Sequence, residues 1–228
     1  MIDSRNVSLL LLLMKNKFND LESPIECNNL IILGIGHIVI FFGSLSFNSY
    51  ILWNYLMNKS DSSSSIDIFV AVMSFLNFIG SLIEIPYCIL AMFHCRYIFK
   101  PIACKITAFI MYFIGCSTIH LMTAISIERY YTIKNTLTNN RISNKTKLKI
   151  IAFCLFCGLF WAVLPLIGWS RYTLEKSLTT CSLVWDDESI ESFSYNVSIF
   201  IFVYLIPLII MITIYIRLIK MVKESFVD

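Results

Sequence analysis

The sequence predicts an all-α protein, a polytopic bundle of transmembrane helices. The 228-residue chain is 57% hydrophobic and only 14% charged, with a mean hydropathy of +0.75, whereas soluble domains carry about 25% charged residues. Five stretches are long and apolar enough to cross a hydrocarbon core of about 30 Å. Because backbone groups in lipid must be paired within the protein, these stretches are predicted to be helices.

The predicted helices occupy most of the chain. They cover about 30–57, 66–93, 102–133, 148–169 and 194–221, with a segment 1–29 before them and a tail 222–228 after them. The run Leu9–Leu13 is too short to span a bilayer. Its neighbouring lysines follow it rather than precede it, which is unlike a signal peptide.

Charges in the connecting segments predict the orientation of the bundle. Lys and Arg gather in 134–149 and 217–223, whereas Asp and Glu gather in 170–193. The positive-inside rule places the two basic segments in the cytoplasm, so the acidic segment and the N-terminus are expected outside, in a plasma membrane protein. The triplet beginning at Asn6 is then a glycosylation sequon on the outer side, although such triplets also arise by chance.

Composition and missing motifs narrow the function. The net charge is +3, and no basic run alternates with aromatic residues, so nucleic acid is not an expected partner. The sequence contains no Gly-rich phosphate loop, no metal-spaced His/Cys cluster and no convergent Ser, His and Asp set, which argues against an enzyme. The expected surroundings of the chain are the lipid bilayer.

The third predicted helix carries the most informative motif. Cys104 opens it and Glu128-Arg129-Tyr130 ends it, with Arg129 25 positions beyond Cys104, the length of one bilayer-spanning helix. The Arg129 guanidinium can pair with Glu128 or swing to another partner, which would make a two-state switch. The alternative is an interfacial arginine that extends to the lipid headgroups.

Four cysteines are expected near the oxidising outer face, where disulfides can form. Cys104 begins the third helix, and Cys181 lies in the outer segment between the fourth and fifth helices. A bond between them would tie this segment across the mouth of the bundle. Cys27 and Cys95 are competing outer partners, so position alone leaves the pairing open.

Two further polar positions lie within predicted helices. Glu84 in the second helix is followed by Pro86, which should kink that helix. An acid at this depth indicates a functional site that faces the bundle, or else a protonated carboxyl near the outer interface. In the fifth helix, Tyr215 lies near the cytoplasmic end, where it could reach Arg129 or act as an interfacial aromatic anchor.

Together these motifs resemble the rhodopsin family of G protein-coupled receptors, and opsins in particular. The cysteine and the Glu-Arg-Tyr motif of the third helix are shared by many members. The segment 168–172, Gly-Trp-Ser-Arg-Tyr, followed by Glu175 six residues before Cys181, is similar to the second outer loop of opsins. Other matching segments are 161–166, 96–99, Ile127, Pro207 and Tyr215. The resemblance covers about 30–221.

The resemblance implies a rhodopsin-like bundle with five of the family's seven helices and a Cys104–Cys181 disulfide. It places the activation switch and the G-protein contact at Glu128, Arg129, Tyr130 and Tyr215. The residues that it places around a retinal pocket are Met111, Tyr112, Gly115 and Cys116 on the third helix and Phe200, Val203 and Tyr204 on the fifth.

The resemblance also implies acids near the retinal site. Glu175 matches the loop acid that serves as a Schiff-base counterion in many opsins, and such an acid stabilises a buried cation by Coulomb attraction. Thr107 stands where vertebrate visual pigments hold a second acid. Glu84 projects near the same place and is a candidate substitute.

The chain departs from the family pattern in several places. Asn77 stands where the family usually has Asp, Phe47 replaces Gly, and Leu155 replaces Trp. We expect helices six and seven to be missing, together with the retinal-binding lysine. The expected protein is therefore an incomplete opsin-like receptor of the class that senses light or retinal and signals through a heterotrimeric G protein, here without covalently bound retinal.

Three alternatives stay open. A rhodopsin-family receptor for a peptide or amine ligand would share the third-helix motif. A non-signalling membrane fragment that only associates with full-length receptor chains would share the whole sequence pattern. A five-helix transporter would show midplane Gly or Pro breaks in paired helices, and no such pairing is found.

Overall fold

The computed structural model describes residues 23–57, 67–134 and 142–225. Within them, five helical spans are long and apolar enough to cross a membrane, which confirms the predicted all-α transmembrane bundle. They are α2 (Cys27–Met57), α3 (Asp67–Phe93), α4 (Pro101–Lys134), α5 (Asn144–Val163) and a continuous run of α6 (Ile190–Ile199), η3 (Phe200–Leu205) and α7 (Ile206–Ser225). The sequon at Asn6 lies outside the described residues.

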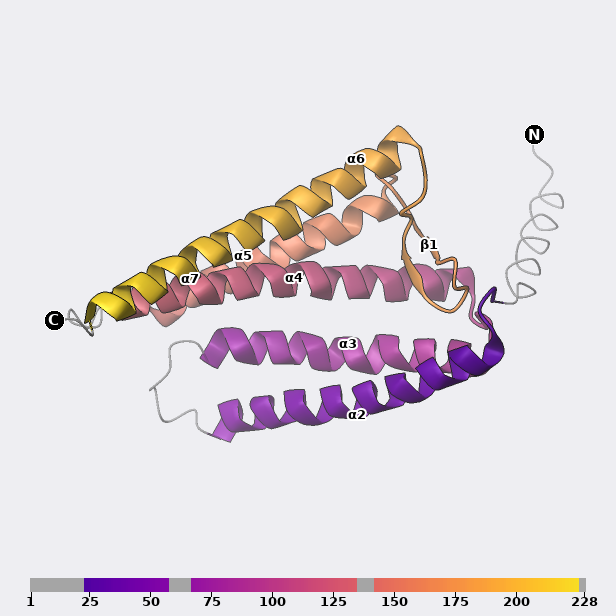
Figure 1. Cartoon of the computed structure of the whole chain (residues 1–228), viewed down its shortest axis with the longest axis horizontal. Helices are drawn as coiled ribbons and strands as arrows, with labels where there is room; N and C mark the ends of the chain where they lie inside the picture. The colour runs from indigo at the N-terminus through magenta and orange to yellow at the C-terminus, as the bar shows by residue number, and fades with distance from the viewer. Residues whose placement is uncertain (1–22, 58–66, 135–141, 226–228) are drawn as a thin grey trace.

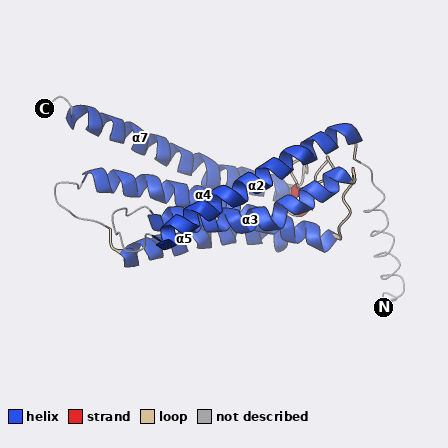
Figure 2. Ribbon diagram, turned by 90° about the horizontal axis from the view of Figure 1, so that it is seen from below, coloured by secondary structure: helices blue, strands red, loops and turns tan. Residues whose placement is uncertain are grey.

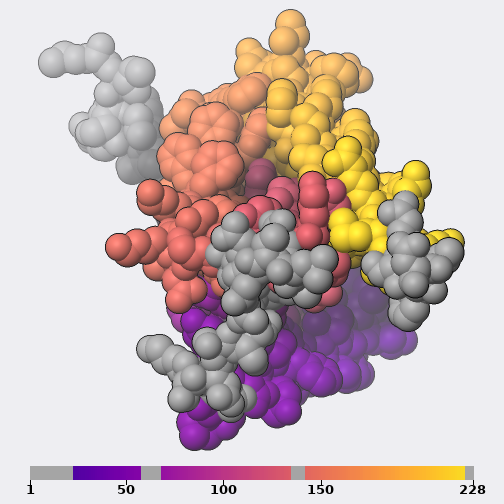
Figure 3. Space-filling model, turned by 90° about the vertical axis from the view of Figure 1, so that its left-hand side faces the viewer, coloured from indigo at the N-terminus to yellow at the C-terminus, as the bar shows by residue number. Residues whose placement is uncertain are grey.

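Helix α4 is the central element of the bundle. It lies between the α2–α3 pair and the group formed by α5 and the α6–η3–α7 run (Figure 1). Each long helix packs along a neighbour, with α2 on α3, α3 on α4, and both α5 and α7 on α4. Figure 3, seen from the end at which α7 terminates, shows α5 and α7 on one side and the α2–α3 pair on the other. Side chains on α4 can therefore face either group.

The two ends of the bundle differ in structure. At one end a two-stranded antiparallel hairpin, β1 (Tyr172–Leu174) and β2 (Cys181–Leu183), folds over the helices (Figure 2). Both disulfides lie at this end, and we call it the disulfide end. Helices α4 and α7 terminate at the opposite end, close to Arg129, and we call it the arginine end (Figure 1).

Helix boundaries differ from the prediction mainly around α5. This helix begins at Asn144 rather than near 148, because the Ser143 hydroxyl caps it by accepting from the Thr146 backbone N–H. It ends at Val163 rather than 169, since Pro165 falls within a 3₁₀ turn, η2 (Leu164–Leu166). Proline lacks a backbone N–H and disfavours continuation of an α-helix. Pro86, in contrast, is accommodated inside α3.

Helices α4 and α5 approach each other closely where they cross at Gly158. A Cβ atom at Gly158 would collide with the Ser117 hydroxyl and come within 2.8 Å of the Ser117 backbone nitrogen and 3.0 Å of the Phe113 carbonyl oxygen. Glycine therefore allows the two backbones to approach. Small residues have this role in membrane helices because close contact gains van der Waals attraction.

Candidate functional site: two cavities beneath the disulfide end

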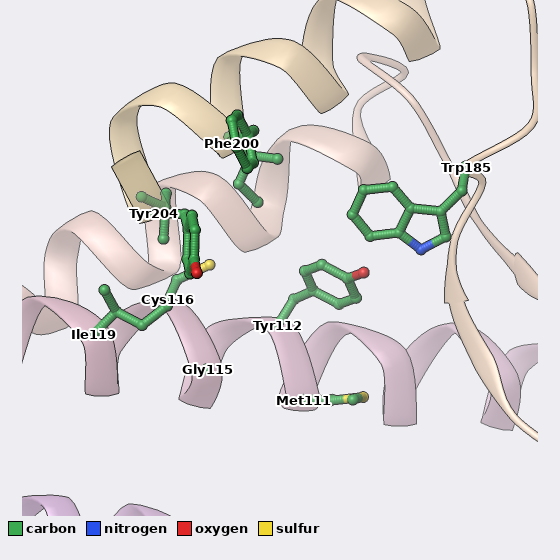
Figure 4. A pocket seen from close by; sticks show the side chains of 10 residues that line it. Met111, Tyr112, Gly115, Cys116, Ile119, Trp185, Phe200 and Tyr204 are labelled. Carbon is green, nitrogen blue, oxygen red and sulfur yellow. The ribbon is translucent and has the colours of Figure 1, made fainter. Parts of the chain in front are cut away.

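An apolar pocket of about 430 Å³ lies between α4 and the α6–η3–α7 run. Figure 4 shows Phe200 and Tyr204 on one wall, Tyr112 on the other, and Trp185 reaching in from the segment after β2. The lining residues are Met111, Tyr112, Gly115, Cys116, Ile119, Trp185, Ile199, Phe200, Val203 and Tyr204. The pocket lacks charged side chains, so it suits an apolar ligand.

The structure brings together all seven residues that the family resemblance placed around a pocket on the third and fifth helices. Three lining residues were missed. Ile119 continues the α4 face by one turn, and Ile199 precedes η3, so helical spacing could have found both. Trp185 lies in a loop, and periodicity gives no signal there. Their role in binding stays a prediction.

The hairpin forms the roof of this region. Cys181 on β2 is bonded to Cys104 on α4, with Cα atoms 5.4 Å apart, so the expected disulfide is confirmed. The Tyr172 hydroxyl on β1 donates to the Ala162 carbonyl at 2.8 Å. The Tyr172 ring lies 5.6 Å from the Tyr112 ring, between centroids. The roof is thus fixed to both α4 and the end of α5.

A second disulfide resolves the open question of cysteine pairing. Cys27 and Cys95, expected as competing partners, are bonded to each other, with Cα atoms 5.3 Å apart. The Ser23 backbone N–H donates to the Cys95 carbonyl at 3.2 Å, and its hydroxyl donates to the Ser177 carbonyl at 2.6 Å. The segment before α2 therefore contacts the tip of the hairpin.

A smaller, polar cavity of about 220 Å³ lies beside the apolar pocket. Its lining combines two acids, one imidazole and several hydroxyl groups: His37, Glu84, Tyr87, Cys88, Tyr97, Thr107, Met111, Glu175, Thr179, Thr180 and Cys181. Glu84 and Glu175, the two acids singled out by the sequence, thus face the same cavity. Met111 lines both cavities.

Local structure positions the acids of the polar cavity. Glu175 begins the hairpin turn, where its backbone N–H donates to the Thr180 carbonyl at 2.9 Å and its carboxylate accepts from the Thr180 hydroxyl at 2.7 Å. Burial raises the pKa of the Tyr97 phenol to about 12, so this hydroxyl stays protonated at neutral pH.

Among the described residues, no group of His, Cys, Asp and Glu is placed to hold a metal ion.

At the arginine end, the residues of the Glu-Arg-Tyr motif differ in how far they are exposed. Glu128 is only 1% exposed, whereas the neighbouring Arg129 is exposed. The Lys134 ammonium lies 5.9 Å from the Tyr130 ring centroid. Tyr215 on α7 is 48% exposed. A contact of Arg129 with Glu128 or Tyr215 stays a prediction.

The five membrane-length helices define a multi-pass membrane protein, and its relatives are receptors rather than enzymes. The model of the seven-transmembrane receptor (rhodopsin family) matches residues 47–227, and the chain belongs to this family as an opsin-like member. It is 31% identical to "Rhodopsin, long-wavelength" of Apis mellifera over 182 residues, which cover 79% of this chain and 48% of that protein. It is 29% identical to "Melanopsin" of Podarcis siculus over 194 residues, covering 84% and 41%.

A solved structure supports the fold. The chain superposes on the crystal structure of squid rhodopsin with a TM-score of 0.82 and 24% sequence identity, covering 91% of this chain and 59% of that one. The chain therefore spans about half the length of the curated relatives it matches. The comparisons confirm the predicted family and fold class.

Proposed function

We propose that this chain forms the retinal-holding part of a light- or retinal-sensing receptor that signals through a heterotrimeric G protein. The observation that carries the proposal is the apolar pocket, which gathers side chains from α4, the α6–η3–α7 run and the segment after β2. Retinal is an elongated apolar molecule, and aromatic and aliphatic walls suit it. When bound, it supplies light absorption and a change of shape.

The residues of the chain bind and orient the ligand in this proposal. Tyr112 and Tyr204 provide facing aromatic walls, and Trp185 closes the outer side. No lysine is among the described residues that line either cavity. We therefore expect the described part of the chain to hold retinal without a covalent bond.

The chemistry of the two ends supports one orientation of the bundle in the membrane. Disulfides persist in oxidising surroundings, which favours the outer side for the disulfide end. Lys145, Lys149, Arg217, Lys220 and Lys223 lie at or near the arginine end, which favours the cytoplasm by the positive-inside rule. A G protein would then meet the end that carries Arg129, and the N-terminus would lie outside.

The pocket can be tested by filling it. A Cβ at Gly115 meets no atom within 4 Å, so Gly115→Phe should fold and place its ring in the pocket. Gly43→Phe on α2 also meets open space, away from either cavity, and is the matched control. We expect retinal to quench tryptophan fluorescence in the wild-type chain and in Gly43→Phe, and not in Gly115→Phe.

Borohydride reduction tests the mode of attachment. We expect no chromophore to stay attached to the 228-residue chain after reduction with 11-cis-retinal present, and no light-dependent nucleotide exchange on a G protein. Attached chromophore would contradict non-covalent binding. Equal quenching in Gly115→Phe and Gly43→Phe would contradict the pocket itself.

A further inference from the structure

The two disulfides of the disulfide end differ in how far they are exposed. Cys104 and Cys181 are only 2% and 8% exposed. Cys27, in contrast, is exposed at the start of α2, and its partner Cys95, just after α3, is half-buried. Thiol–disulfide exchange requires that a thiolate reach one sulfur of the bond, so its rate depends on exposure. A thiol in solution should therefore reduce Cys27–Cys95 well before Cys104–Cys181.

The exposed disulfide holds a peripheral helix to the bundle. Among the described elements, α2 packs extensively only on α3 (Figure 1). Cys27 is the first residue of α2, so the bond joins this end of α2 to the segment that follows α3. Beside it, the Ser23 backbone N–H donates to the Cys95 carbonyl, and the Ser23 hydroxyl donates to the Ser177 carbonyl at the hairpin tip. The disulfide therefore also positions the segment that reaches the hairpin.

The same parts of α2 and α3 form one wall of the polar cavity. His37 on α2 and Cys88 on α3 both line it. Cys88 is buried in a small apolar cluster with Leu30 of α2 and Met92 of α3, and Cys95 packs against this cluster. The disulfide thus lies next to the packing that holds this wall together. If the outer part of α2 moves away from α3, the cavity opens and the Cys88 thiol becomes accessible.

A hydrogen bond between α2 and α3 limits that movement. The hydroxyl oxygens of Ser44 on α2 and Ser81 on α3 lie 2.6 Å apart. Reduction of the disulfide leaves this contact in place. The part of α2 between Cys27 and Ser44, which includes His37, is therefore the part that can separate from α3.

We propose that Cys27–Cys95 is a thiol-sensitive switch, whose reduction releases the outer part of α2 and opens the polar cavity at the disulfide end. The thiolate of a low-molecular-weight thiol attacks one sulfur, the sulfur–sulfur bond breaks, and the other cysteine leaves as a thiolate that takes up a proton. A second thiol molecule then displaces the first cysteine, so two cysteine thiols form and two molecules of the reductant are oxidised to their disulfide. The inference does not rest on retinal binding in the apolar pocket.

Two free cysteines report the state of the cavity. Cys88 is buried and lines the polar cavity, so its labelling reports local opening. Cys154 is also free and buried, but it lies on α5 and is not among the described lining residues, so its labelling reports general loosening. The 228-residue chain in nanodiscs is incubated with glutathione. The thiol is then removed without air, a charged maleimide is added, and mass spectrometry follows the labelling of each cysteine with time.

The expected result is selective on both counts. Glutathione should free Cys27 and Cys95 and leave the buried disulfide intact. The labelling rate of Cys88 should then rise by about tenfold or more, because removing a cross-link makes local opening easier. The labelling rate of Cys154 should not change.

A double variant reproduces the reduced state without a thiol. In Cys27→Ser/Cys95→Ser, Cys88 should be labelled as fast as in the reduced wild-type chain, and glutathione should have no further effect. Cys157→Ser keeps both disulfides and is the matched control, which should behave like the wild-type chain. Reduction of the folded wild-type chain gives the same measurement if the double variant does not fold.

Three results would overturn the switch. Reduction of both disulfides at the same rate would remove its selectivity. Unchanged labelling of Cys88 after reduction of Cys27–Cys95 would show that the cavity stays closed. Faster labelling of Cys154 together with Cys88 would show general unfolding in place of local opening. The retinal pocket is tested separately, by the comparison of Gly115→Phe with Gly43→Phe.

Discussion

The two ends of the bundle are held together in different ways. At the disulfide end, two covalent links and the hairpin join α2, α3, α4 and the loop before α6. The Tyr195 hydroxyl donates to the Trp161 carbonyl at 2.7 Å, which ties α6 to α5. At the arginine end, α7 packs on α4, and the described residues there carry no disulfide. The disulfide end is therefore cross-linked covalently, whereas α4 and α7 pack together without a disulfide between them.

The largest expected effect comes from breaking the link between hairpin and bundle. Cys104→Ser should lower the free energy of unfolding by about 3–5 kcal/mol, because the disulfide closes a long loop in the unfolded chain. The measurement is thermal unfolding in detergent without reductant. Cys157→Ser, at a half-buried free cysteine, is the control.

The same experiment sharpens the comparison between the two disulfides. Cys27→Ser should also destabilise the chain, since its loop is of similar length: 68 residues against 77. Only Cys104→Ser should weaken retinoid binding strongly, because Cys181 belongs to the strand that leads to Trp185. Equal losses of binding in both variants would argue that the whole end acts as one unit.

A smaller effect is expected at the α4–α5 crossing. Gly158→Ala should lower the free energy of unfolding by about 1–3 kcal/mol, because the added methyl collides with Ser117 and the two helices must separate. Gly36→Ala on α2, where a Cβ meets nothing within 4 Å, should leave it unchanged or raise it. Equal stability of the two variants would show that α4 and α5 can move apart without a loss of stability.

At the arginine end, neighbouring residues should respond unequally. Arg129→Ala is expected to change the free energy of unfolding by less than about 0.5 kcal/mol, since the side chain is exposed. Glu128→Ala should lower the free energy of unfolding by about 1–3 kcal/mol. The substitution leaves space at a buried position, and the polar groups around it lose the carboxyl group. A large loss in Arg129→Ala would show that this end is held more firmly than its exposure indicates.

The smallest expected effect is a pH dependence at the start of α6. The Ser189 backbone N–H, donating at 3.1 Å, is the main cause that lowers the pKa of Asp187, with Ser192 and Arg171 adding to it. Because its pKa is lowered in the folded state, ionised Asp187 stabilises the fold at pH values above the ordinary pKa of 3.8. This stabilisation is lost as the pH falls below about 4 and the carboxylate becomes protonated.

Unfolding midpoints compared between neutral and acidic pH test this contribution. The unfolding midpoint of the wild-type chain should decline below about pH 4, and Asp187→Asn should make this decline smaller. Glu188→Gln, at the adjacent exposed acid, should leave the decline as it is. An unchanged decline in Asp187→Asn would assign the acid sensitivity to other carboxylates.

The sequence predicted the helices well and the loops poorly, for a physical reason. Apolar length alone locates a membrane helix, and the family resemblance supplied seven pocket residues. The Cys27–Cys95 pair could not be deduced, because four cysteines allow three connectivities. The polar cavity and the position of Trp185 in the apolar pocket depend on how the hairpin and the segment after it fold back, which local patterns do not encode.

The π-helical segment η3 determines which face of the last helical span points into the bundle. From Tyr195 onward, buried residues before, within and just after it recur at an interval of four, at Tyr195, Ile199, Val203 and Pro207. In a straight α-helix this interval would rotate the stripe by about 40° at each step. The wider turn absorbs that rotation. Deleting one residue from η3 would therefore turn everything beyond it by about 100° and carry Leu218 away from its buried position.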